Sequence, residues 1–217
     1  METLIVLILS VLAGAAASSQ PAADEKPPAP EVPLVTESEG TGAPGGSRRS
    51  ALVVGDSLAV GAAPHLQREL PGWTIETSAQ KGKHASEGAA EITGRDDLPP
   101  VIVVSLGTND DPAASDSFAA TVQAVLDAAG PAGCVVWPNI VRPPYAGVSY
   151  GGYNQALERL YATSPNLFVV DWVGIAAADP SLLAPDGVHA TPSGYAVRAR
   201  AIAQAVRSCG SLGAIGD

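Results

Sequence analysis

The sequence predicts an α/β domain of three layers, in which helices cover both faces of a five-stranded, doubly wound parallel sheet. Two observations carry this prediction. Five short apolar runs alternate with five stretches typical of helices along residues 51–210. The apolar runs also lack the polar alternation of half-exposed strands, which indicates strands buried on both faces, as in a parallel sheet.

The elements are expected in strict alternation. The strands are the runs at 51–54, 73–77, 101–106, 134–138 and 167–171. A helical stretch follows each of them, at 57–70, 85–93, 115–129, 151–163 and 192–207. Because each helix connects the end of one strand to the start of the next, the strands are expected to run parallel. No internal repeat is present, so the five units are expected to form one domain over 51–210, followed by a tail at 211–217.

Residues 1–19 are predicted to be a signal peptide or an N-terminal anchor. Residues 4–17 are apolar and uncharged, and small residues follow them up to Ser19, as in the hydrophobic and cleavage regions of a signal peptide. The apolar stretch is short for a membrane span. The first three residues carry no Lys or Arg, which is atypical of a signal peptide, so retention as an anchor stays open beside export.

Residues 20–50 are predicted to be a disordered linker. The segment contains six prolines, several acidic residues and a group of glycines at 40–46. Such a composition has no hydrophobic period and too little apolar surface to order the chain. The whole layout predicts a secreted domain, or one tethered to a bacterial cell surface.

Charge and composition argue against several classes of ligand. The formal net charge is −10, with no basic patch to neutralise phosphates, so no nucleic-acid partner is expected. The three histidines are far apart in sequence and no Cys-x-x-Cys is present, so no metal site is expected. No Gly-x-Gly-x-x-Gly precedes a helix, which argues against a dinucleotide. We therefore expect no cofactor.

The two cysteines, Cys134 and Cys209, are predicted to form a disulfide. In an exported protein two cysteines commonly pair. Cys134 opens the fourth strand and Cys209 ends the last helix, so both are expected at the edge of the sheet opposite the carboxyl ends of the strands. Two buried free thiols are the alternative.

The most informative motif is Gly55-Asp56-Ser57-Leu58, between the first predicted strand and the first predicted helix. A serine at such a turn can expose its Oγ while its own N–H lies at a helix N-terminus, where the dipole favours negative charge. These features suit the nucleophile of an acyl transfer. The motif alone is also compatible with ordinary turn and N-cap chemistry, or with a phosphate-binding loop.

Further candidates follow other strands at the same edge, where doubly wound sheets gather functional groups. After the third strand, the sequence Gly-Thr-Asn-Asp presents the side-chain amide of Asn109. After the second strand, Gly82 can bring its backbone N–H close to a ligand because it has no Cβ. Before the last helix, Asp186 and His189 are three residues apart, and the glycine between them permits a tight turn.

Together these residues supply the parts that acyl transfer needs. Ser57 would be the nucleophile, His189 the base and Asp186 the group that orients it. The oxyanion donors would be the N–H groups of Ser57 and Gly82 and the amide of Asn109. Each residue has a simpler interpretation when taken singly: Asn109 could be a turn residue, and an Asp three positions before a His also arises by chance. Their joint placement at strand ends favours catalysis.

The motifs resemble those of the SGNH (GDSL) hydrolase family over nearly the whole of residues 51–207. The serine block resembles Gly55-Asp56-Ser57-Leu58, and Gly107-Thr108-Asn109-Asp110 and Asp186-Gly187-Val188-His189 match two further blocks. Gly82 is the weakest of the four matches. The resemblance implies a flavodoxin-like SGNH fold and catalytic roles for Ser57, Asp186 and His189.

Within that family, the chain is most similar to the extracellular SGNH domains of bacterial cell-envelope O-acyltransferases. The similarity rests on Gly82-Lys83-His84, Asn139-Ile140-Val141-Arg142, Val170-Asp171-Trp172 and the Asp186–His189 block. Arg142 is predicted to contact substrate. His84, on a loop near the proposed cleft, is expected either to contact substrate or to have no role, and His65, inside the first helix, is expected at the surface. Those proteins usually carry a multi-spanning membrane domain that donates the acyl group, and this chain has one hydrophobic segment at most.

We accordingly expect a monomeric serine esterase that removes O-acyl groups, acetyl above all, from a carbohydrate or another small ester. One alternative is an O-acyltransferase domain that moves acetyl to a cell-envelope glycan with the help of a separate membrane partner. A third is a non-catalytic glycan-binding module, although a pure binder has no need of Asp186 and His189 together with Ser57. The sequence does not specify the acyl chain or the alcohol.

Overall fold

The computed structural model describes residues 49–212 of the 217-residue chain, with side chains described as far as residue 209. The predicted signal peptide or anchor (1–19), all but the end of the predicted linker (20–50) and most of the predicted tail (211–217) lie outside the described residues. Among residues 49–212, no helix is long and apolar enough to cross a membrane.

The centre of the domain is a five-stranded parallel sheet. Its strands are β1 (Ser50–Gly55), β2 (Thr74–Ala79), β3 (Val101–Ser105), β4 (Cys134–Pro138) and β5 (Leu167–Val170). They lie in the order β2-β1-β3-β4-β5, and every neighbouring pair is parallel. The chain therefore winds from β1 to β2 in one direction and through β3, β4 and β5 in the other, which is the doubly wound topology. The predicted fold class is confirmed.

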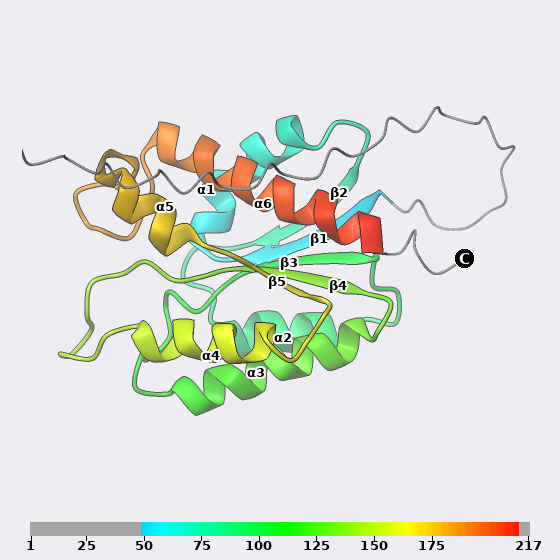
Figure 1. Ribbon diagram of the computed structural model, residues 1–217, viewed down its shortest axis with the longest axis horizontal. Helices are drawn as coiled ribbons and strands as arrows, with labels where there is room; N and C mark the ends of the chain where they lie inside the picture. The colour runs from blue at the N-terminus through cyan, green and yellow to red at the C-terminus, as the bar shows by residue number, and fades with distance from the viewer. Residues whose placement is uncertain (1–48, 213–217) are drawn as a thin grey trace, which may run out of the picture. The chain divides into compact units, whose positions relative to one another are not determined.

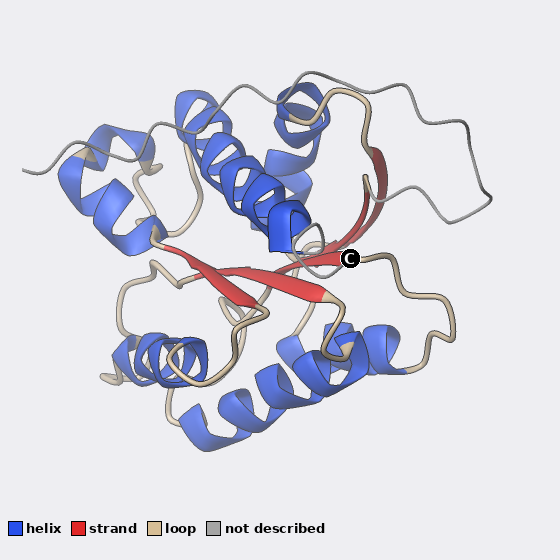
Figure 2. Ribbon diagram, turned by 45° about the vertical axis from the view of Figure 1, so that its right-hand side comes forward, coloured by secondary structure: helices blue, strands red, loops and turns tan. Residues whose placement is uncertain are grey.

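Helices cover both faces of the sheet (Figures 1 and 2). Helices α1 (Ser57–Glu69) and α6 (Pro192–Leu212) lie on one face, and α2 (Ala85–Thr93), α3 (Ser115–Ala129) and α4 (Gly151–Tyr161) lie on the other. In β1, Leu52 and Val54 belong to the core beneath α2, α3 and α4, whereas Ala51 and Val53 belong to the core beneath α1 and α6. Because successive side chains point to opposite, equally covered faces, the strand is apolar throughout.

Some elements differ from the prediction. Strand β2 is an edge strand that pairs only with β1, so its residues are exposed or half-buried and Glu76 lies at the surface. Helix α6 runs to Leu212, beyond the expected end at 207. A short helix, α5 (Trp172–Ala178), and a 3₁₀ turn, η1 (Pro180–Leu182), occupy a segment for which no element was predicted. Seven residues are too few to display a helical period in the sequence.

A disulfide joins Cys134, at the start of β4, to Cys209 in α6, with 5.8 Å between their Cα atoms. The predicted bridge is confirmed, and both cysteines are buried. Because Cys134 and Ser50 begin parallel strands, the bridge and the first residue of the sheet lie at the amino edge. The predicted site residues follow strands at the opposite, carboxyl edge.

Candidate active site

The four residues predicted to form the triad and the Asn109 oxyanion donor meet at the carboxyl edge of the sheet. Ser57 begins α1 directly after β1, Asn109 follows β3, and Asp186 and His189 lie in the loop before α6. All four line one surface hollow of about 410 Å³. The rest of its wall comes from the loop between β4 and α4 and from the loop before α6, namely Arg142, Pro143, Pro144, Tyr145 and Val188.

The position of Ser57 is fixed by the two residues that precede it. A Cβ at Gly55 would collide with the Cβ of Ala59 in the first turns of α1, so glycine allows the helix to start tightly against the end of β1. Asp56 is the N-cap of α1, and its Oδ1 accepts a hydrogen bond from the N–H of Leu58 at 2.9 Å. Ser57 is therefore the first residue of a capped helix, where unpaired N–H groups and the helix dipole favour negative charge.

Ser57, His189 and Asp186 form a continuous hydrogen-bonded chain. The Oγ of Ser57 lies 3.0 Å from Nε2 of His189. The Nδ1 of the same imidazole lies 2.6 Å from Oδ2 of Asp186. In the neutral tautomer that carries its proton on Nδ1, His189 donates to Asp186 and accepts from Ser57. This is the arrangement of a nucleophile, a base and a group that orients the base.

The carboxylate of Asp186 is held by the backbone as well as by the imidazole. Its Oδ1 accepts from the N–H groups of Val188 and His189, both at 3.0 Å. The hydrogen bond from His189, followed by these two backbone bonds, lowers the pKa of Asp186 from 3.8 to about 2. The group is therefore ionised at neutral pH.

The loop that carries these two residues closes on itself. The N–H of Gly187 donates to the carbonyl of Ala184 at 2.9 Å, and the N–H of Ala184 donates to the carbonyl of His189 at 2.7 Å. Gly187 has a φ of 67°, in the left-handed region that favours glycine. The tight turn explains how residues three apart reach each other, as the sequence predicted.

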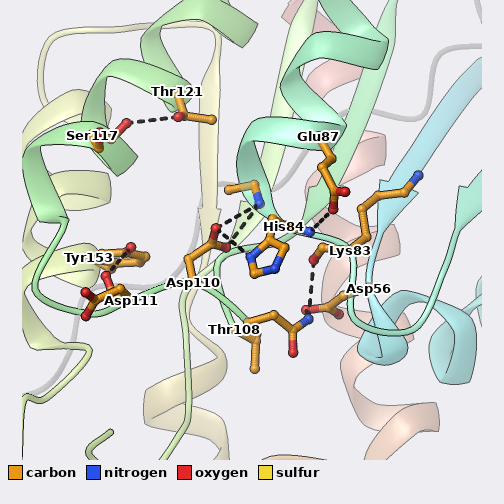
Figure 3. A network of polar contacts seen from close by, with 12 residues as sticks. Asp56, Lys83, His84, Glu87, Thr108, Asp110, Asp111, Ser117, Thr121 and Tyr153 are labelled. Atoms are coloured by element: carbon orange, nitrogen blue, oxygen red, sulfur yellow. Dashed lines mark hydrogen bonds and ion pairs between the residues drawn. The ribbon is translucent and has the colours of Figure 1, made fainter. Parts of the chain in front are cut away.

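The amide of Asn109 already has two partners. Its Nδ2 donates to Oδ2 of Asp56 and to the backbone carbonyl of Lys83, each at 3.3 Å. Asp56 and Lys83, both drawn in Figure 3, belong to different segments, the N-cap of α1 and the loop before α2. Asp56 is fully buried, and burial raises its pKa, while the Leu58 N–H, Arg198 and Thr108 act in the opposite direction. Asp56 thus links the cap of α1 to the orientation of Asn109.

The residue after Asn109 has a structural part. Both carboxylate oxygens of Asp110 accept from the N–H of Ala85, at 3.3 and 3.1 Å, and Oδ1 also lies 3.3 Å from Nδ1 of His84 (Figure 3). Glu87 accepts from the backbone N–H of His84 at 2.7 Å. These bonds fasten the start of α2 to the end of β3 and hold the His84 ring beside Asp110.

The structure places Gly82 and His84 in a neighbouring hollow rather than in the wall around Ser57. This second hollow, of about 530 Å³, is lined by Gln80, Lys81, Gly82, Lys83, His84, Glu87 and Glu91. The connection between the two hollows is Asn109, through its bond to the carbonyl of Lys83. An oxyanion role for Gly82 and a substrate contact for His84 stay predictions.

Arg142 stands between the Ser57 hollow and a third hollow of about 380 Å³, and it lines both. Its Nη1 donates to the carbonyl of Thr108, the residue before Asn109. Its Cζ lies 5.8 Å from the centroid of the Tyr150 ring. The guanidinium is therefore fixed at the rim of the candidate site, where the sequence resemblance predicted a substrate contact.

A buried cation lies behind the site, and sequence reasoning missed it. Arg198 of α6 is 2% exposed, and its Nη2 donates to Oγ of Ser105 at 3.1 Å. Its Cζ lies 5.2 Å from the centroid of Trp172. Burial lowers the pKa of Arg198 to about 10, and attraction to Asp56 opposes that change. The sequence signal was a cation four residues before Ile202, in line with the buried face of α6.

His65 is half-buried on α1, where its Nδ1 lies 2.8 Å from Nη2 of Arg68, and it does not line the Ser57 hollow. Among the described side chains, no group of three or more His, Cys, Asp and Glu residues is placed to hold a metal ion.

Known proteins and structures resemble the chain at low sequence identity. No protein-family model matches it. YrhL of Bacillus subtilis (strain 168), provisionally named a peptidoglycan O-acetyltransferase, is 25% identical over 174 residues, which is 80% of this chain. That alignment covers 26% of YrhL, so the chain spans about a quarter of this relative.

Solved structures agree in fold with the described domain. The C-terminal catalytic domain of the Streptococcus pneumoniae peptidoglycan O-acetyltransferase A, solved with a methylsulfonyl adduct, has a TM-score of 0.60 at 19% identity, covering 76% of this chain and 94% of that one. A lipolytic protein of the G-D-S-L family from Veillonella parvula has a TM-score of 0.56 at 18% identity, covering 73% and 96%. The described domain therefore has the fold of the SGNH (GDSL) hydrolases, as its motifs predicted.

Proposed function

We propose that the chain is a serine esterase that removes acetyl or another small O-acyl group from a carbohydrate through an acyl-enzyme. The observation that carries the proposal is the chain of contacts from Ser57 Oγ to His189 Nε2, at 3.0 Å, and from His189 Nδ1 to Asp186, at 2.6 Å. These three groups line one open hollow at the N-terminus of a helix. A binding module would have no use for this set of contacts.

The reaction follows from the positions of these atoms. Ser57 Oγ attacks the ester carbonyl while its proton passes to Nε2 of His189. The imidazolium then gives that proton to the oxygen of the departing alcohol, which leaves an acyl group on Ser57. Water attacks the acyl-enzyme in the same way, with His189 again taking and returning a proton. Asp186 keeps the Nδ1 proton in place and stabilises the imidazolium.

The negative charge that develops on the carbonyl oxygen needs donors. The N–H of Ser57, at the start of α1, is one of them, and the dipole of the helix adds to it. The amide of Asn109 is the second donor. Each of its present hydrogen bonds is 3.3 Å long. Because an oxyanion is a stronger acceptor, it can replace one of these two partners. The N–H of Gly82, which lines the neighbouring hollow, is the third donor that the sequence resemblance implies.

The proposed substrate class rests on the relatives. Two of the proteins that the chain resembles are named peptidoglycan O-acetyltransferases. An acylated cell-envelope glycan is therefore the substrate that we propose, with the domain secreted or tethered to the bacterial surface by residues 1–19 and acting as a monomer.

Acyl transfer is the second candidate, and the names of the same relatives favour it. If a sugar hydroxyl rather than water attacks the acyl-enzyme, the same residues catalyse O-acetylation. In that case a separate membrane protein would supply the acyl group. Water and the sugar hydroxyl compete for one intermediate, so the two activities differ only in the acceptor.

The test is turnover of p-nitrophenyl esters of increasing acyl length, with and without an oligosaccharide acceptor. Hydrolysis is expected to be fastest with acetate, and Ser57→Ala and His189→Ala should each reduce it by about 10³-fold or more. Acetylated oligosaccharide among the products would identify a transferase. Undiminished hydrolysis by a folded Ser57→Ala protein would contradict the proposal.

A further inference from the structure

The loop between β4 and α4 forms a stiff arm beside the candidate active site. Tyr145 and Val148 pair as a two-residue hairpin, with N–H to carbonyl distances of 3.0 and 2.9 Å in the two directions. The turn residues Ala146 and Gly147 have φ angles of 49° and 80°. Positive φ at both positions is the geometry of a type I′ turn, which matches the twist of the paired strands.

The arm is braced at both of its ends. On one side Pro143 packs against the Asp186–His189 loop, so closely that a Cβ at Gly187 would lie 3.2 Å from its ring. On the other side Tyr150 is buried, and its hydroxyl donates to the carbonyl of Asp110 at 3.0 Å. Pro143 and Pro144 also restrict the backbone that leads into the turn. The arm is therefore positioned before any ligand binds.

Tyr145 is presented to solvent by this arm. It lines the hollow that contains Ser57 and His189, yet 57% of its surface is exposed. Ala146 beside it adopts a left-handed conformation that a residue with a Cβ rarely takes. Such strain is retained where the surrounding structure has a use for the resulting geometry. A large, rigid, exposed aromatic ring at the mouth of a reaction site has the properties of a contact surface for a ligand.

We propose that Tyr145 stacks on a sugar ring of the substrate and so selects acylated oligosaccharides over small esters. The inference rests on the proposed esterase function and extends it to a specificity residue. A β-linked pyranose presents only C–H groups on one face, and this face packs flat on the electron-rich face of an aromatic ring. The ring contributes area while losing little conformational freedom, because it has only two χ angles.

The surroundings of Tyr145 suit a chain of sugars better than a long acyl tail. Arg142 lines both the Ser57 hollow and the adjacent third hollow. The wall of the third hollow contains the polar residues Ser149 and Asn154 among apolar residues. A mixed polar and apolar wall of this kind matches a sugar, which has hydroxyl edges and a C–H face. An oligosaccharide can thus place its acylated unit over Ser57 and extend past Arg142.

The chain contains a matched control for this proposal. Tyr161, the last residue of α4, is also 57% exposed but lines neither hollow. We would measure kcat/KM for p-nitrophenyl acetate and for an O-acetylated tetrasaccharide of β-1,4-linked N-acetylglucosamine. The kcat/KM for the tetrasaccharide, divided by that for p-nitrophenyl acetate, should fall by about tenfold in Tyr145→Ala. Tyr145→Phe should keep the ratio of the unsubstituted protein, because stacking needs the ring and not the hydroxyl, and so should Tyr161→Ala.

Two outcomes would overturn the proposal. One is an unchanged ratio in Tyr145→Ala. The other is a loss in that variant that grows with acyl length on p-nitrophenyl esters, which would place the ring against the acyl group.

A binding measurement separates this proposal from the esterase function. The unacylated tetrasaccharide would be titrated calorimetrically into Ser57→Ala, which retains the arm, and into Ser57→Ala combined with Tyr145→Ala or with Tyr161→Ala. Kd should rise by about tenfold only when Tyr145 is replaced. Equal Kd values in the three proteins would refute stacking. A rise with Tyr145→Ala, together with no ester hydrolysis by the protein that retains Ser57, would refute only the proposed function.

Discussion

His189 is joined to Asp186 by two hydrogen bonds, one from its ring and one from its backbone. Nδ1 lies 2.6 Å from Oδ2, and the backbone N–H donates to Oδ1 at 3.0 Å. The carboxylate thus fixes both the loop and the direction of the imidazole, whose Nε2 lies 3.0 Å from Ser57 Oγ. Both functions need the ionised carboxylate, so the pH profile of the reaction tests its charge state.

We expect a single acid limb in the pH profile of kcat/KM. The pKa of Asp186 is about 2, below its ordinary 3.8. A histidine ordinarily changes charge between about pH 5 and 8. The carboxylate therefore stays ionised over the whole range in which a histidine base is protonated. A group with a lowered pKa favours the folded state above pH 3.8, and this contribution is lost as the pH falls toward 2. Activity should therefore fall with a slope of one proton, before stability falls. A slope of two above pH 4 would contradict the assignment.

Replacement of Asn109 tests its part in the reaction. If its amide binds the oxyanion, Asn109→Ala should lower kcat by about 10²–10³-fold and change KM little, because the contact forms mainly in the transition state. Asn139→Ala is the matched control: Asn139 is also half-buried at the end of a strand, but it bonds Asp171 and does not line the Ser57 hollow. That control should affect Tm rather than kcat. A normal kcat in Asn109→Ala would remove Asn109 from the site.

The disulfide should stabilise the domain without affecting the chemistry. It links residues 75 positions apart, for which the chain-entropy model gives about 4 kcal/mol in the free energy of unfolding. Urea unfolding with and without reductant would measure this, and the Cys134→Ala/Cys209→Ala variant controls for direct effects of the reductant. Turnover per folded molecule should hold, because the bridge lies at the amino edge of the sheet. Superimposable unfolding curves for the oxidised and reduced protein would contradict the expectation.

Arg198 and Asp56 should be coupled energetically. Both are buried. The attraction between their charges acts to lower the pKa of Asp56 and to raise that of Arg198, so it favours the charged form of each. Arg198→Met removes this attraction while Asp56 stays buried, and should lower the free energy of unfolding by about 1–3 kcal/mol. Adding Asp56→Asn, which removes the charge and keeps an acceptor for the N–H of Leu58, should restore part of the loss. Additive effects in this double-mutant cycle, to within about 0.5 kcal/mol, would show the two residues to be independent.

Local motifs and topology were sufficient to predict which residues lie together at the carboxyl edge of the sheet. Ser57, Asn109 and the Asp186–His189 pair each follow a recognisable element, and parallel strands bring their carboxyl ends to one edge. The buried position of Arg198 was not predicted, because it depends on how α6 packs over Ser105. The prominence of Tyr145 depends on a hairpin turn within a loop whose sequence shows no period. The place of Gly82 depends on a loop conformation in the same way.

The most direct test of the central claim is to trap the acyl group on the protein. The purified protein would be mixed with p-nitrophenyl acetate, quenched in acid within the first turnover and digested for peptide mass spectrometry. We predict an acetyl group on Ser57, absent from Ser57→Ala and strongly reduced in His189→Ala. Turnover of the ester without acetylation of Ser57, or with the acetyl group on another residue, would contradict the account.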